Sequence, residues 1–132
     1  MIFLNLFLKL SNMDSFDIEK YRLDLVLIRE TAERIIKDFD LFGFDIVFSG
    51  NEDKAYEEMN KQLQPVFHEL IYNNRQKLMR MLYIIDISEE KLSSTINKHP
   101  DEPMANIISH LVIERELQKV ITRRYFSQKG KE

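Results

Sequence analysis

The pattern of apolar positions predicts a long amphipathic helix near the start of the chain. Seven apolar residues recur there at alternating intervals of four and three, which places their side chains on one side of a helix. We expect this helix to span residues 17–42 and to end at Gly43. An apolar seam of that length requires cover from other helices, either of this chain or of a second copy. The seam consists of Tyr21, Leu25, Ile28, Ala32, Ile35, Phe39 and Phe42.

The rest of the chain shows helical spacing in shorter runs. Together with the capping residues beside them, these runs predict helices at residues 52–64, 65–85, 88–98 and 102–126. The boundary between the first two is placed at Pro65, because a proline inside a helix removes a backbone donor and crowds the preceding turn. One long kinked helix is the alternative. Asp86 or Ser88 is expected to cap the helix that follows.

The segment at residues 44–48 has an ambiguous pattern. It contains Ile46, Val47 and Phe48, which favour a β-strand. A single strand leaves its backbone groups unpaired, and residues 2–8 and 83–87 are the segments that could pair with it. We favour an extended linker whose aromatic side chains enter the bundle, and an α+β fold with a small two- or three-stranded sheet is the alternative.

These elements predict an all-α fold, a bundle of four to five helices with a short extended segment at residues 44–48. The chain has three glycines and three prolines, which is too few for a sandwich or barrel of many short strands. Its 132 residues are enough for one domain with a hydrophobic core. The predicted core comprises Leu25, Ile28, Ile35, Phe39, Leu63, Phe67, Leu70, Leu78, Leu82, Ile108 and Leu111.

The first twelve residues differ from the rest. Residues 1–10 are strongly apolar, but they are fewer than the roughly 20 residues of a membrane-spanning helix and lack the basic start of a signal peptide. Met13 opens a polar sequence that is typical of a protein start. We interpret residues 1–12 as either a mis-assigned start or an apolar N-terminal arm that docks on the bundle, a partner or a membrane surface. Residues 13–132 are then a single helical domain.

The last predicted helix carries two apolar faces on nearly opposite sides. Its first half has one apolar face, which includes Ile108 and Leu111, and its second half has the other. Either both faces are buried in a crowded bundle, or the two halves contact different neighbours, one of them a partner; a break in the helix is the least favoured interpretation. The residues predicted to contact a partner are Ile113, Leu117, Val120 and Ile121.

The charges are distributed unevenly along the chain. Residues 14–60 contain 13 acidic and 6 basic side chains, whereas residues 61–132 contain 9 acidic and 12 basic ones. Halves of opposite sign can attract each other within one fold or head to tail between copies. Together with the long seam, this asymmetry favours a protein that associates with a protein partner or with itself.

A cluster of basic residues near the end of the chain predicts an alternative function. Nucleic acid is the alternative partner, bound through Arg115, Lys119, Arg123 and Arg124. Three of these four share a helix face and could follow a phosphate backbone. Against this, the whole chain has a net charge of −3, and basic side chains near a helix C-terminus are also expected from the helix dipole. Membrane association is disfavoured, because the apolar face changes side along this helix.

No motif predicts catalysis, a cofactor or a metal. The sequence has no cysteine and no phosphate-binding or hydrolase motif. His110 and Glu114 lie four residues apart on a helix, but two ligands do not define a metal site, and a core or interface histidine is the favoured interpretation. An enzyme would instead show a deep pocket that gathers His68 or His110 with carboxylates from other helices. No catalytic residue, metal ligand or small-molecule substrate is predicted.

The function expected from the sequence is therefore coarse. We expect a small, non-enzymatic helical module for protein–protein interaction, or an accessory protein, that self-associates. The absence of cysteine fits the cytoplasm, and an excess of isoleucine over alanine is typical of AT-rich bacterial genomes. The sequence identifies no partner and no specific role.

Overall fold

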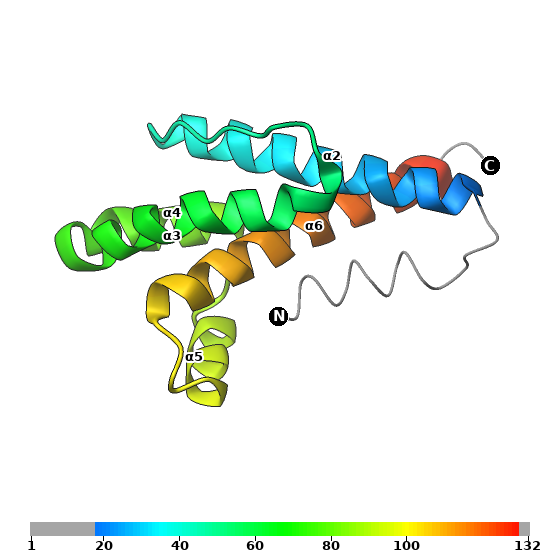
Figure 1. Ribbon diagram of the computed structural model, residues 1–132. Helices are drawn as coiled ribbons and strands as arrows, with labels where there is room; N and C mark the ends of the chain where they lie inside the picture. The colour runs from blue at the N-terminus through cyan, green and yellow to red at the C-terminus, as the bar shows by residue number, and fades with distance from the viewer. Residues whose placement is uncertain (1–17, 130–132) are drawn as a thin grey trace.

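The computed structural model describes residues 18–129, and over this range it has five α-helices, one short 3-10 helix and no strand. The predicted all-α fold is confirmed. Helix α6 (Met104–Lys129) runs beneath α2 (Ile18–Leu41) and α3 (Ala55–Asn73), while α5 (Glu89–Lys98) projects from the bundle beside the start of α6 (Figure 1). Residues 1–12, the proposed arm or mis-assigned start, lie outside the described range.

Helix α2 buries the central part of the predicted seam. Ile28, Ala32, Ile35 and Phe39 are buried against the other helices. Leu25 is only half-buried, so its place in the predicted core is wrong; it lies near the start of α2, where the cover from other helices is incomplete. The helix ends as predicted, with Gly43 at a φ of 87°. The Gly43 and Phe44 amides donate to the carbonyls of Asp40 and Phe39, which satisfies two groups at the helix end.

The segment after α2 is an extended linker without strand pairing in the described structure. Ile46 is buried, and Phe44 and Phe48 pack partly buried against the core, as predicted for the linker. The side-chain amide of Gln62 on α3 holds this linker, since it accepts from the Val47 amide at 2.9 Å and donates to the Val47 carbonyl at 2.8 Å. One side chain thus pairs with both backbone groups of Val47.

The break between α3 and α4 (Arg75–Ile85) falls at Asn74, and the predicted boundary at Pro65 is wrong. Pro65 lies inside a continuous α3. Its side chain and that of Lys61, four residues earlier, are both exposed, so water can reach the carbonyl that the proline leaves without a helical donor. Asn74 leaves the helical region and its side chain accepts from the Lys77 amide, which caps the new helix.

The turn between α4 and α5 uses both residues that were expected to cap. Ser88 is the N-cap of α5 and accepts from the Lys91 amide at 3.0 Å. Asp86 instead ends α4, in a left-handed conformation with a φ of 73°. No residue of α5 is buried, and Leu92 is only partly buried against the core. Helix α5 is therefore the helix with the least support from packing.

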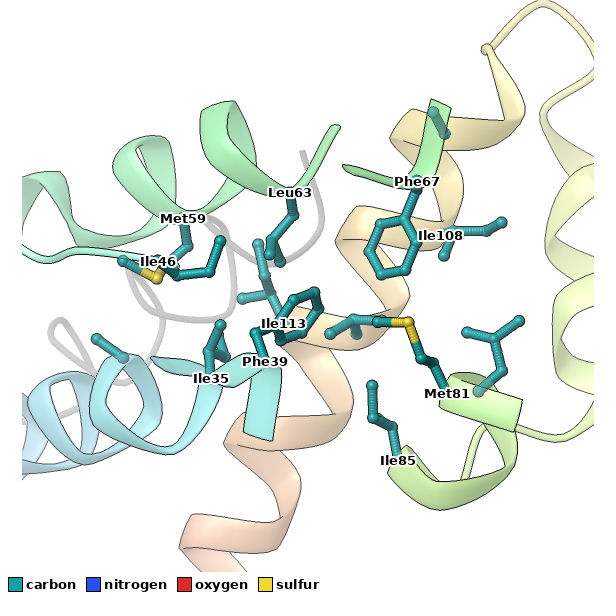
Figure 2. Packing of buried hydrophobic residues seen from close by; sticks show 14 of the residues in the cluster. Ile35, Phe39, Ile46, Met59, Leu63, Phe67, Met81, Ile85, Ile108 and Ile113 are labelled. Carbon is teal, nitrogen blue, oxygen red and sulfur yellow. The ribbon is translucent and has the colours of Figure 1, made fainter. Parts of the chain in front are cut away.

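The core lies where α2, α3, α4 and α6 meet. The core side chains drawn in Figure 2 carry no nitrogen or oxygen atom. The Phe39 and Phe67 rings pack edge to face, with centroids 5.8 Å apart. Met81 and Ile85 of α4 enter from one side, and Ile108 of α6 lies beside Phe67 (Figure 2). Every predicted core residue except Leu25 is buried.

Candidate functional site

The predicted interaction residues of α6 lie inside the single chain. Ile113, Leu117 and Val120 are buried, and Ile121 packs partly buried against the core. Ile108 and Val112, on the other predicted face, are buried as well. Burial on both sides agrees with the interpretation of α6 as a helix enclosed by its own bundle. Contact with a partner through these four residues stays a prediction, which would require the bundle to open.

The predicted nucleic-acid contacts are mostly paired with acids of the same chain. Arg115 Nη2 lies 2.8 Å from Asp86 Oδ2, and Lys119 Nζ lies 3.3 Å from Glu116 Oε1. The Arg115 guanidinium holds the pKa of Asp86 below its usual range. Arg124 donates to both carboxylate oxygens of Glu30. Arg123, the fourth predicted contact, is exposed.

A cleft lined by polar residues opens between α3, α5 and the start of α6, with a volume of about 590 Å³. Its lining contains amides, imidazoles, a phenol, a hydroxyl and one carboxylate, and neither lysine nor arginine. Eight of the nine lining side chains carry a polar group. The nine are Tyr56, Asn60, Gln64, Thr95, His99, Glu102, Asn106, Ile107 and His110.

His110 sits at the inner side of this cleft between a phenol and a carboxylate. Its Nδ1 lies 3.3 Å from the Tyr56 hydroxyl, and its Nε2 lies 3.3 Å from Glu114 Oε2. Burial, followed by the charge of Glu102, raises the pKa of Tyr56, while the His110 side chain lowers the pKa of Glu114.

Two helices place the polar groups of the cleft. Tyr56, Asn60 and Gln64 follow one another at intervals of four on α3, and Asn106 and His110 do so on α6. The buried Ser109 joins the helices, because its hydroxyl donates to Asn60 Oδ1 at 2.7 Å. The spacing on α3 was visible in the sequence, but nothing there showed that it would face the polar residues of α6.

The cleft lacks the features of the enzyme pocket described above. Its carboxylate, Glu102, comes from the turn just before α6, and Glu114 belongs to α6 itself. His68 lies elsewhere, with its ring 4.9 Å from that of the exposed Tyr72. Among the residues that the structure describes, no group of three or more histidine, aspartate or glutamate side chains is arranged to hold a metal ion.

A second polar cluster surrounds the buried Glu116 between α2 and α6; we call it the buried charge cluster, and it consists of Glu116 with the partly exposed Arg34, Asp38 and Lys119. The Glu116 side chain is 0 % exposed. Arg34 Nε lies 3.5 Å and Lys119 Nζ 3.3 Å from Glu116 Oε1. Neither Glu116 oxygen accepts a hydrogen bond from the part of the chain that the structure describes.

Burial makes the ionised form of Glu116 costly. Desolvation, followed by the close contact with the Asp38 side chain and by the negative charge of Asp38, raises the pKa of Glu116 to about 7, although Lys119 and Arg34 oppose the shift. The sequence placed Glu116 on the polar side of the last helix. Its burial was missed because that side of α6 is covered by α2, and no pattern within α6 shows which neighbour covers it.

Comparison with known proteins adds no assignment. The chain matches no protein family, none of the curated proteins and none of the solved structures compared with it. Within residues 18–129, no helix is both long enough and apolar enough to cross a membrane.

Proposed function

We propose that this protein is a non-enzymatic interaction module that binds a second copy of itself through the exposed face of α4. The observation that carries the proposal is the exposure of large apolar side chains on the hairpin of α3 and α4: on α4, Tyr83 is 84 % exposed and Met79 and Ile84 are also exposed, and Tyr72, near the end of α3, is 74 % exposed. Single exposed apolar residues are ordinary, whereas several on one helical hairpin are typical of a contact surface. We call these four residues the α4 face.

The composition of the α4 face favours a protein partner. Tyrosine, methionine and arginine are enriched at protein interfaces, and tyrosine contributes a large contact area at a low entropic cost. The exposed Arg75 and Arg80 flank the apolar residues, and α4 has no acidic residue. Among the described residues, neither arginine forms an ion pair. The face is thus apolar at its centre and positively charged around it.

A complementary surface exists on the same chain, which favours a second copy as the partner. Leu41 and Val47 are exposed after the end of α2, and the exposed acids Asp40 and Asp45 lie beside them in the sequence. This acidic surface has the opposite charge to the α4 face, as expected from the unequal halves of the chain. A contact between two different surfaces joins copies head to tail, so it produces rings or chains of molecules.

Sedimentation and light scattering of the full chain test this proposal. We expect concentration-dependent association, and we expect Tyr72→Ser with Tyr83→Ser to weaken it at least about tenfold without loss of helicity, since both side chains are exposed. Lys61→Ser, at an exposed position of α3 outside both surfaces, is the matched control. A chain that stays monomeric at all concentrations would overturn the proposal.

Charge reversal tests whether the partner is a second copy. Arg80→Glu and Asp45→Arg should each weaken association, because each brings like charges together. An equimolar mixture of the two variants should associate again, since every contact in the mixture can then join opposite charges. If the mixture behaves like either variant alone, the acidic surface is not the partner of the α4 face.

Nucleic acid remains the alternative function, with less support. Only Arg123 among its four predicted contacts is exposed without an acidic partner in the described chain, while Arg115, Lys119 and Arg124 already contact acids. Binding that weakens steeply with added salt and is lost when these four residues are changed to glutamate would favour it.

A further inference from the structure

We propose that the cleft between α3, α5 and α6 binds a small organic cation that carries a primary ammonium group. The proposal is independent of the α4 face. The cleft volume of about 590 Å³ lies within the range of small-molecule sites. Although most of the lining surface is made by carbon atoms, Ile107 is the one lining residue without a polar side-chain group.

The charged groups of the lining favour cations over anions. Glu102 is the one carboxylate in the lining, and in the described structure it forms no ion pair. No lysine or arginine lines the cleft, so a phosphate or carboxylate ligand would find no fixed positive charge there. The charge of Glu102 also acts on Tyr56 across the cleft, where it contributes to the raised pKa of that phenol.

The hydrogen-bonding groups of the lining match the three donors of an ammonium group. Gln64 and Asn106 make no side-chain hydrogen bond within the described chain, so their carbonyl oxygens are available as acceptors in the cleft that the Glu102 carboxylate also lines. The Tyr56 ring adds an aromatic surface, which attracts a cation. Carboxylate, amide oxygens and an aromatic ring together select a compact ammonium ion over a neutral ligand of the same size.

The geometry of the cleft floor supports a preformed site. The Tyr56 hydroxyl lies 3.3 Å from His110 Nδ1, and the Ser109 hydroxyl donates to Asn60 at 2.7 Å, so these groups of the floor are positioned without a ligand. The outer wall is supplied by Thr95 and by His99 at the end of α5. Since α5 has no buried residue, this wall can adjust to a ligand while the floor stays fixed.

Three probes with the same four-carbon length test the charge preference: 1,4-diaminobutane, 1,4-butanediol and succinate. Calorimetric titration of the full chain at pH 7.5, with amide NMR spectra to locate the shifts, should show binding of the diamine alone. The side-chain amide signals of Gln64 and Asn106 should move. Equal or tighter binding of butanediol or succinate, or no binding of any probe, would overturn the proposal.

Substitution of the carboxylate locates the site. Glu102→Gln keeps the shape of an exposed side chain, and we expect it to weaken diamine binding about tenfold or more, because a charge-assisted contact is lost. Glu89→Gln, at an exposed position of α5 outside the cleft lining, is the matched control and should leave binding unchanged. If both variants weaken binding equally, the diamine responds only to the overall charge and the cleft is not its site.

Discussion

Two glutamates of α6, Glu114 and Glu116, differ in their access to water: the Glu114 side chain is 20 % exposed, and the Glu116 side chain is fully buried. His110, with Tyr56 and Glu114, borders a cleft that is open to solvent, whereas Glu116 lies in the buried charge cluster and is 0 % exposed. The two glutamates are two residues apart on one helix, yet their pKa values move in opposite directions. Access to water and the nearest charged neighbour decide the behaviour of a carboxylate here, more than its place in the sequence does.

A substitution at Leu117, next to Glu116 on α6, should have the largest effect on stability. Leu117→Asp places a second carboxylate in a fully buried position with no partner for it, so we expect a loss of more than about 4 kcal/mol in the free energy of unfolding. Circular dichroism during urea denaturation measures it, with the exposed Gln118→Asp as the control. A variant that stays helical and loses only self-association would show instead that this face of α6 contacts a partner.

The pH dependence of stability is the next largest effect. Because the folded state raises the pKa of Glu116 from 4.5 to about 7, the proton is held more tightly in the folded than in the unfolded chain. The free energy of unfolding should therefore fall as the pH rises from about 5 to 8, by up to about 3 kcal/mol. Denaturation at several pH values measures this loss.

The other carboxylates with shifted pKa values affect the free energy of unfolding at lower pH, outside the range from pH 5 to 8. The pKa values of Glu52, Asp86 and Glu114 are lowered in the folded state, so their contributions are present above the unfolded pKa and disappear only as the pH falls below it. The stability maximum is expected near pH 5. A stability that rises steadily between pH 5 and 8 would show that Glu116 is ionised at little cost.

Replacement of Glu116 by its neutral isostere gives a somewhat smaller effect. Glu116→Gln should raise the free energy of unfolding at pH 8 by about 1–3 kcal/mol and flatten its pH dependence, because the buried charge is removed while the shape is kept. Thermal denaturation at pH 5 and pH 8 measures both changes. Glu114→Gln is the matched control, and we expect a small loss of stability because the contact with His110 is weakened. If the Glu116 variant is less stable at pH 8, the contacts with Arg34 and Lys119 outweigh desolvation.

Changes in the cluster of Tyr56, His110 and Glu114 beside the cleft should cost the least stability. Tyr56→Phe removes a hydroxyl that lies 3.3 Å from His110, and we expect a loss of about 1 kcal/mol or less, because water in the cleft can take the place of the hydroxyl. Denaturation midpoints measure the difference, and the exposed Tyr72→Phe serves as the control. A loss above about 3 kcal/mol would mean that the contact of Tyr56 with His110 contributes as much to the free energy of unfolding as we expect from the buried charge cluster.

Local signals predicted much of the fold. The central part of the α2 seam and the helix end at Gly43 follow from residue spacing and from the conformational freedom of glycine, and both are confirmed. Leu25 of the seam is only half-buried, and the Tyr21 side chain lies outside the described residues. The break near Pro65 was wrong because the sequence cannot show that this proline faces water, where the unpaired carbonyl is tolerated. The true break at Asn74 depends on a side-chain cap, which the polar Asn73, Asn74 and Arg75 only suggested.

The sites were harder to predict than the helices. The cleft and the buried charge cluster each combine residues from helices far apart in the sequence, as in the contact of Tyr56 with His110. Helical spacing shows which residues share a face, but it does not show which face meets which neighbour. The same limit hid the burial of Glu116, since the covering residues Arg34 and Asp38 belong to α2.

The pairing of Gln62 with Val47 affects the tendency of this protein to aggregate at high concentration. Ile46, Val47 and Phe48 form a short run with a high tendency to add strands to one another, the starting point of fibrous aggregates. The Gln62 amide occupies the Val47 amide and carbonyl, so an incoming backbone finds this pair already taken. A single glutamine on a neighbouring helix thereby protects an all-helical protein from intermolecular β-pairing at its one extended segment within residues 18–129.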